Sequence, residues 1–210
     1  SMRILCFGDS NTWGLNPLNA SRHPKRWTRV LAALRPEDEI IEEGLNGRTV
    51  NSPDHKNPER HGMTALPMVM QSHAPLDQVV IMLGTNEFKR HFGKCANQIA
   101  LGIGEMIKYI QNPANWAHQA PPQILVVSPI VVGRGLINHP EFLYQEIDEY
   151  GIMQSEYLAN ILERICDQYG VAFLDAKTVA KPSNIDFVHM DEENHHALGQ
   201  AIAKKIALGV

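Results

Sequence analysis

The stretch Arg3-Ile-Leu-Cys-Phe-Gly-Asp-Ser-Asn-Thr-Trp-Gly14 runs from a short apolar segment directly into a polar turn. Residues 4–7 are apolar, too few for a typical helix, and bounded by a glycine, which indicates a buried strand near the start of an α/β domain. Ligands of such domains collect at the carboxyl ends of the strands. Ser10 lies in the turn that follows, and a serine hydroxyl becomes a good nucleophile only when a neighbouring base takes its proton. The rest of the chain must supply that base.

Further apolar runs alternate with helical patterns along the whole chain. Strands are predicted at 39–43, 76–83, 124–127 and 171–174, and helices at 27–34, 63–73, 95–111, 147–169 and from 193 to the end. This order predicts a three-layer α/β/α sandwich with a mainly parallel sheet of about five strands and right-handed crossovers.

Length and composition favour one globular domain over residues 2–210, with Ser1 interpreted as a cloning remnant. The net charge of −4 gives no electrostatic case for binding nucleic acid. No secretory signal or apolar run of about 18 residues is present, so we expect no membrane contact and a cytoplasmic location. The three cysteines are widely spaced and odd in number, which indicates reduced thiols.

Four loops follow predicted strands and should open at the same edge of a parallel sheet. They carry Ser10, Gly47, Asn86 and the pair Asp186 and His189. His189 could act as general base toward Ser10 while Asp186 holds the imidazole in one tautomer. The backbone N–H groups of Ser10 and Gly47, with the amide of Asn86, could form an oxyanion hole, where one donor contributes about 3 kcal/mol.

Each of these residues also has a purely structural interpretation. Serine and asparagine are common in turns and helix caps, glycine often serves only a positive φ, and Asp186 with His189 could be a cap and a surface histidine. Their joint occurrence after predicted strands favours a catalytic site over these separate explanations.

The four blocks resemble those of the SGNH hydrolases, the GDSL-type esterase and lipase superfamily. Gly8-Asp-Ser10 is similar to the nucleophile block, Gly47 to the glycine block, Gly84-Thr-Asn86 to the asparagine block, and Asp186-x-x-His189 to the acid and base block. The resemblance implies a flavodoxin-like α/β/α fold and a serine esterase that works through an acyl-enzyme without a cofactor.

Two positions depart from the pattern of this family. Asn11 follows the serine where many members have leucine, and Glu87 replaces the usual aspartate beside the asparagine. The wider context is most similar to the bacterial arylesterase and perhydrolase branch. That similarity implies short acyl groups such as acetyl, with acyl transfer or perhydrolysis left open, and a homo-oligomer as one form of assembly.

Several residues near the four blocks are predicted to contact a small ester substrate. We expect Asn11, Trp13 and Asn46 to form walls of the site, although packing explains Trp13 equally well. Loop 131–141 is expected to set acyl length and leaving group, with Val131 and Val132 lining an apolar pocket. His195 and His196 are adjacent on a predicted helix and lack a ligand set, so no metal is expected.

Two other classes of protein remain alternatives. The turn after the first strand could cradle a phosphate or a flavin, as in flavodoxin-like binding proteins, although Asp9 would place negative charge at the anion site. The chain could also be a catalytically silent homologue that only binds ligands.

Overall fold

The sheet contains five parallel strands, as the sequence predicts. The computed structural model describes residues 1–139, 141 and 146–209. The strands are β1 (Arg3–Gly8), β2 (Glu39–Gly44), β3 (Gln78–Met82), β4 (Gln123–Ser128) and β5 (Ala172–Asp175), and they lie side by side in the order β2-β1-β3-β4-β5. In this order the chain changes direction across the sheet between β1 and β3, the point where flavodoxin-like sheets bind ligands. The loop after β1 carries Ser10, and the loop after β3 carries Asn86.

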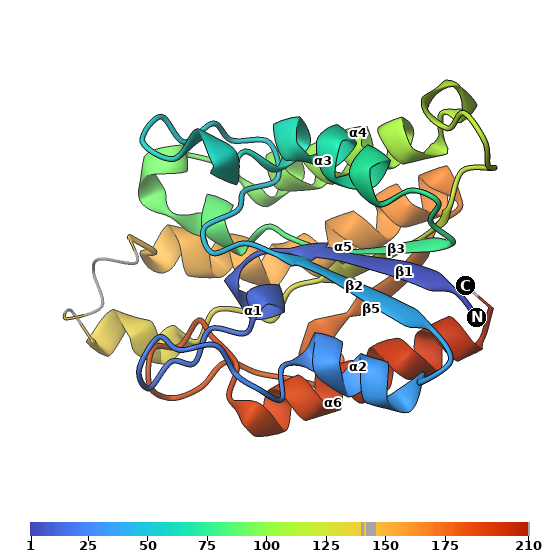
Figure 1. The fold of residues 1–210 in the computed structure, drawn as a ribbon. Coiled ribbons are helices and arrows are strands. Elements are labelled where there is room, and N and C mark those ends of the chain that lie inside the picture. Colours follow the sequence, from blue (N-terminus) through green and yellow to red (C-terminus); the bar gives the residue numbers. More distant parts are fainter. Residues whose placement is uncertain (140, 142–145, 210) are drawn as a thin grey trace.

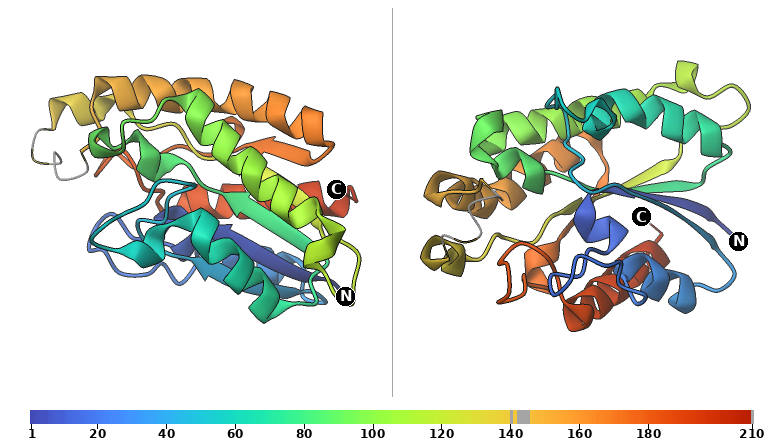
Figure 2. Two further views of the ribbon diagram at one scale, coloured as in Figure 1. Left: turned by 90° about the horizontal axis from the view of Figure 1, so that it is seen from above. Right: turned by 60° about the vertical axis from the view of Figure 1, so that its left-hand side comes forward.

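Helices cover both faces of the sheet and give the three predicted layers (Figure 1). One face packs against α2 (Trp27–Leu34) and α6 (Glu192–Ala207), and the other against α3 (Gly62–His73), α4 (Ala96–Gln111) and α5 (Glu149–Tyr169). Alternate residues of β1 enter the two cores, with Leu5 and Phe7 on the α3–α5 side and Ile4 and Cys6 on the α2 side. The two further views in Figure 2 show the same layers.

Two helix starts differ from the sequence prediction for a physical reason. The turn at the nucleophile is a short helix, α1 (Ser10–Trp13), because the side chain of Asp9 caps it. Helix α5 begins at Glu149 and not at residue 147, because the Asp148 side chain accepts a hydrogen bond from the Gly151 N–H and so caps the helix there.

Short 3-10 helices complete the connections. They are η1 (Pro58–Arg60), η2 (Thr85–Phe88), η3 (Arg90–Phe92), η4 (Pro113–Asn115), η5 (Arg134–Asn138) and η7 (Ala176–Thr178). All three cysteines are free thiols, as predicted. Within the described ranges, no helix combines the length and the apolar character that a membrane crossing requires.

Candidate active site

The end of β1 brings Ser10 to the edge of the sheet. The Asp9 carboxylate accepts a hydrogen bond from the Asn11 N–H at 3.0 Å, so it caps α1 and fixes the turn. Burial raises the pKa of Asp9 to about 6. Gly8 leaves no room for a side chain, since a β-carbon there would lie 2.1 Å from Thr12 Oγ1. Ser10 therefore starts α1 directly at the end of the strand.

The Asp–His turn, residues 186–190, meets Ser10 from the other end of the chain. Ser10 Oγ lies 2.8 Å from His189 Nε2, and His189 Nδ1 lies 2.6 Å from Asp186 Oδ2. The second carboxylate oxygen, Asp186 Oδ1, accepts the backbone N–H groups of Val188 at 3.0 Å and His189 at 2.9 Å. The structure thus joins the three predicted side chains in one chain of hydrogen bonds.

Opposing effects on the pKa of Asp186 determine the charge of this turn. Burial alone would raise the pKa of Asp186, but hydrogen bonds from the His189 ring and two backbone N–H groups hold it below its usual range. Asp186 is therefore an acceptor near neutral pH, so His189 Nδ1 carries a proton and Nε2 can accept one from Ser10.

A strained residue lies within the Asp–His turn. Phe187 has φ of 62°, a left-handed conformation that is unusual for a bulky side chain. Its ring fills the space beside Gly135, where a β-carbon would lie 2.3 Å from Phe187 Cε1. Its carbonyl accepts the Gly133 N–H at 2.8 Å, so the turn is attached to the loop after β4. Sequence analysis missed this residue, because no local pattern marks it.

Asn11 is placed differently from the predicted substrate contact. Only 2% of this residue is exposed, and both ends of its amide are engaged by the Asp–His turn. Asn11 Nδ2 donates to the Val188 carbonyl at 3.1 Å, and Asn11 Oδ1 accepts the Met190 N–H at 3.1 Å. The side chain therefore links the nucleophile turn to the turn that carries the histidine, and it does not form a wall of the site.

The Gly47 loop, residues 44–52, forms the opposite side of the site. Gly47 has φ of 83°, which requires glycine. Asn86, in η2, donates from Nδ2 to the Arg48 carbonyl at 2.9 Å, so the two predicted oxyanion residues lie next to each other. The space beside Gly47 holds the Arg60 side chain, since a β-carbon would lie 2.7 Å from Arg60 Cδ and Nε.

Glu87 explains how the loop is ordered without the usual aspartate. Its Oε2 accepts the backbone N–H groups of Val50 at 2.7 Å and Asn51 at 3.1 Å, and the Ser52 hydroxyl at 3.3 Å. The residue is 2% exposed, and burial raises its pKa to about 7. Because glutamate is longer than the usual aspartate, its carboxylate reaches the Gly47 loop and accepts hydrogen bonds from the backbone of that loop.

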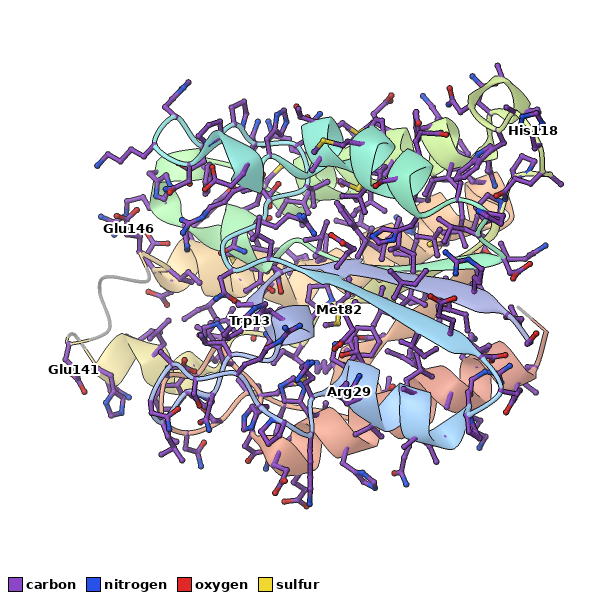
Figure 3. The ribbon with its side chains drawn as sticks, in the orientation of Figure 1. Trp13, Arg29, Met82, His118, Glu141 and Glu146 are labelled. Atoms are coloured by element: carbon purple, nitrogen blue, oxygen red, sulfur yellow. The ribbon has the colours of Figure 1, made fainter. Side chains whose placement is uncertain are left out.

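The remaining predicted pocket residues fall into two groups. Trp13 lies on α1 (Figure 3), and it is half-buried, as are Asn46 and Val131. Val132 is 2% exposed and packs in the hydrophobic core, so the prediction that it lines a pocket does not agree with its placement. Residue 140 of the predicted pocket loop lies outside the described residues.

His195 and His196, the histidines considered as metal ligands, lie on different faces of α6. His195 is fully buried and its Nδ1 accepts the Trp27 N–H at 3.1 Å, while His196 is exposed. Among the described residues, no group of three or more histidine, cysteine or acidic side chains is arranged so that it could hold a metal ion.

Comparisons with known proteins agree with the fold. The model of the GDSL-like lipase/acylhydrolase family matches residues 6–197. Est24, a carbohydrate acetylesterase from Sinorhizobium meliloti, is 34% identical with a TM-score of 0.91, and the alignment covers 100% of each chain. The M. smegmatis aryl esterase is 36% identical with a TM-score of 0.92, again over 100% of each chain.

No curated protein matches the sequence. The family model nevertheless spans most of the chain, and the solved structures cover all of it. The chain therefore belongs to the GDSL-like lipase/acylhydrolase family, and it is a carboxylic ester hydrolase with the SGNH hydrolase fold.

Proposed function

We propose that this protein is a serine esterase that cleaves short-chain carboxylic esters through an acyl-enzyme on Ser10. The observation that carries the proposal is the unbroken hydrogen-bond chain from Ser10 Oγ through His189 to Asp186, at 2.8 Å and 2.6 Å. Nucleophile, base and orienting acid are the three side chains that acyl transfer needs.

In the first half of the reaction, Ser10 Oγ attacks the ester carbonyl carbon while its proton passes to His189 Nε2. The Asp186 carboxylate stabilises the imidazolium that forms. The carbonyl oxygen becomes negative, and the N–H groups of Ser10, Gly47 and Asn86 Nδ2 are the donors that would bind it. His189 then gives its proton to the departing alkoxide, which leaves an acyl group on Ser10.

In the second half, water attacks the acyl carbon while His189 takes its proton. His189 then returns that proton to Ser10 Oγ as the bond between the acyl carbon and Oγ breaks and the carboxylic acid leaves. An alcohol or hydrogen peroxide can replace water at this step, so acyl transfer and perhydrolysis are alternative fates of the same intermediate. The names of the two relatives support acetyl esters of aryl or sugar alcohols as the substrate class. Homo-oligomer formation and a cytoplasmic location stay predictions of the sequence.

No observation favours the phosphate or flavin cradle as a second function. Such a ligand would bind the N–H groups at the start of α1, but the Asp9 carboxylate already accepts the Asn11 N–H there. A buried acid at that point would repel a phosphate.

The proposal is tested by treating the protein with a fluorophosphonate and measuring its intact mass and its hydrolysis of p-nitrophenyl acetate. We expect one adduct per chain and ester turnover, both lost in Ser10→Ala and both kept in Ser21→Ala, which removes an exposed hydroxyl. A folded protein that gives neither adduct nor turnover would contradict the proposal and would favour a silent homologue.

A further inference from the structure

Two half-buried cations, Arg60 and Lys89, lie beside the residues that form the proposed oxyanion hole. Arg60 packs against Gly47, and Lys89 follows Asn86 by three residues, with its backbone N–H bonded to the Asn86 carbonyl at 3.2 Å. Neither residue has a role in the mechanism described above. Each is therefore available to bind a part of the substrate other than the reacting carbonyl.

The Arg60 side chain is held in place but is not well paired. The backbone carbonyl of Arg60 accepts the Thr49 N–H at 2.8 Å, which fixes the Arg60 backbone against the Gly47 loop. Its nearest acid is Asp54, with 3.7 Å from Arg60 Nη1 to Asp54 Oδ2, longer than a hydrogen bond. Asp54 Oδ1 accepts the backbone N–H groups of Lys56 and Asn57. Within the described residues, the Arg60 guanidinium donates no hydrogen bond.

Lys89 is even less satisfied. In the part of the chain that the structure describes, its ammonium has no hydrogen bond and no close ion pair, and the side chain is half-buried. Burial lowers the pKa of Lys89, and the charge that acts most strongly on it, the Arg60 guanidinium, lowers it further. The charge of Asp9, next to the nucleophile, acts on Lys89 in the opposite direction and raises the pKa of Lys89.

Arg60 has one long ion pair, to Asp54, and Lys89 has none among the described residues. These two partly desolvated like charges repel each other, and an added anion would relieve that repulsion. We propose that Arg60 and Lys89 form a subsite for a carboxylate carried by the ester substrate. The inference rests on the proposed esterase function and narrows its substrate class.

The surroundings favour a single negative charge. Asp54, Glu146 and Asp9 all act on Lys89 and partly offset the two cations. A dianionic phosphate would meet these acids as well as the cations, whereas a carboxylate can accept hydrogen bonds from Arg60 and Lys89 with its two oxygens. An ester that also carries a carboxylate therefore matches the charge of the site.

The test compares matched anionic and neutral esters. For a charge on the leaving group, 4-acetoxybenzoate is paired with phenyl acetate; for a charge on the acyl group, monoethyl glutarate is paired with ethyl butyrate. We expect the wild-type protein to prefer the anionic member of at least one pair in kcat/KM, with a preference that weakens as salt is added. The preferred pair tells which side of the ester carries the charge.

Arg60→Met and Lys89→Met should each reduce the ratio of anionic to neutral kcat/KM about tenfold or more, since hydrogen bonds to a charged group are strong. Lys56→Met is the matched control, because it removes an exposed cation from the same segment as Arg60. Its ratio should stay within about twofold of the wild-type ratio, as expected for a screened surface charge. Circular dichroism and fluorophosphonate labelling check that each variant folds.

Three results would overturn the subsite. The wild-type protein could show no preference for either anionic ester. The variants could keep the wild-type ratio. Alternatively, anionic and neutral esters could lose activity equally, which would mean that the cations support the oxyanion itself. Turnover of no ester at all would instead contradict the esterase function. If a variant does not fold, competitive inhibition of the wild-type protein by benzoate but not by benzamide, weakened by salt, supports the subsite, and equal inhibition contradicts it.

Discussion

The Asp–His turn and the Gly47 loop face each other across Ser10, yet they differ in how fully their polar groups are paired. In the turn, both Asp186 oxygens, the Val188 carbonyl and the Met190 N–H all have partners within the protein. Around the loop, several buried polar atoms have none in the described structure: Asn46 Oδ1, Arg48 Nε and Glu87 Oε1. Buried polar groups without partners are uncommon and call for an explanation.

The task of the Asp–His turn explains why its polar groups are paired. A general base must be oriented before substrate arrives, so its supporting bonds are internal to the protein. An oxyanion hole must keep donors available for a charge that develops only during the reaction. The base side is therefore complete by itself. On the loop side, Asn46 Oδ1 and Glu87 Oε1 are acceptors, so they are not the donors that an oxyanion would use.

The largest effect is expected from replacing the acid of the Asp–His turn. Asp186→Asn removes the charge that stabilises the His189 imidazolium and replaces an acceptor with a group that can also donate. By analogy with triads of this kind, kcat for p-nitrophenyl acetate should fall on the order of 10³ to 10⁴-fold. Asp175→Asn is the control, because Asp175 caps a short helix and lies outside the triad. A loss below about tenfold would show that Asp186 does not act on the base.

On the loop side, Glu87 predicts how stability depends on pH. Burial raises the pKa of Glu87 from 4.5 to about 7, so the folded protein binds this proton more tightly than the unfolded chain does. The resulting contribution to the free energy of unfolding, about 3 kcal/mol, is present below pH 4.5 and is lost as pH rises through 7. Glu87→Gln, which does not titrate, should remove this pH dependence.

The measurement is urea unfolding of both proteins between pH 4.5 and 8. Asp9, whose pKa is raised to about 6, contributes with the same sign in both proteins, and its charge also raises the pKa of Glu87. The difference between the two curves therefore reports Glu87 together with its interaction with Asp9. Glu105→Gln, an exposed acid on α4, should leave the wild-type curve unchanged. Parallel curves for wild type and Glu87→Gln would contradict the assignment.

Asn11 tests whether the pairing of the Asp–His turn stabilises the fold. Asn11→Ala leaves the buried Val188 carbonyl and Met190 N–H without partners. Because each of the two unsatisfied buried groups costs about 1 to 3 kcal/mol, we expect the free energy of unfolding to fall by at least about 2 kcal/mol. Asn97→Ala, at an exposed position of α4, should change it by less than about 0.5 kcal/mol. Equal stability of the two variants would mean that water replaces the lost bonds.

The sequence predicts those features that depend on local patterns and strand order, and it does not predict those that depend on the path of a loop. Strand periodicity and loop order predict the parallel sheet and bring Ser10, Asn86 and His189 to one edge, because strand direction alone determines where those loops lie. The predictions for Asn11 and Val132 are wrong because neither the single turn of α1 nor the loop after β4 has a periodicity that tells which way a side chain points. Arg60 reaches Gly47 through the path of a long loop, which no local pattern encodes.

Substitutions of Phe187 have the smallest predicted effect, and they test how the conformation of the Asp–His turn is stabilised. Its left-handed conformation costs roughly 1 to 2 kcal/mol, and the ring contacts with Gly133 and Gly135 offset that strain. Phe187→Ala loses the ring and keeps the strain, whereas Phe187→Gly loses the ring and relieves it. We therefore expect the glycine variant to be more stable than the alanine variant by about 1 kcal/mol.

The control is a position without strain, at which alanine should be more stable than glycine. Gly104 lies inside α4, where an added β-carbon has no contact shorter than 3.5 Å, so Gly104→Ala should stabilise the protein by up to about 1 kcal/mol. Urea unfolding of the four proteins, wild type included, measures both differences. Alanine favoured over glycine at both positions would mean that the Asp–His turn relaxes once the ring is gone. The strain would then belong to the Phe187 side chain and not to the turn that positions His189.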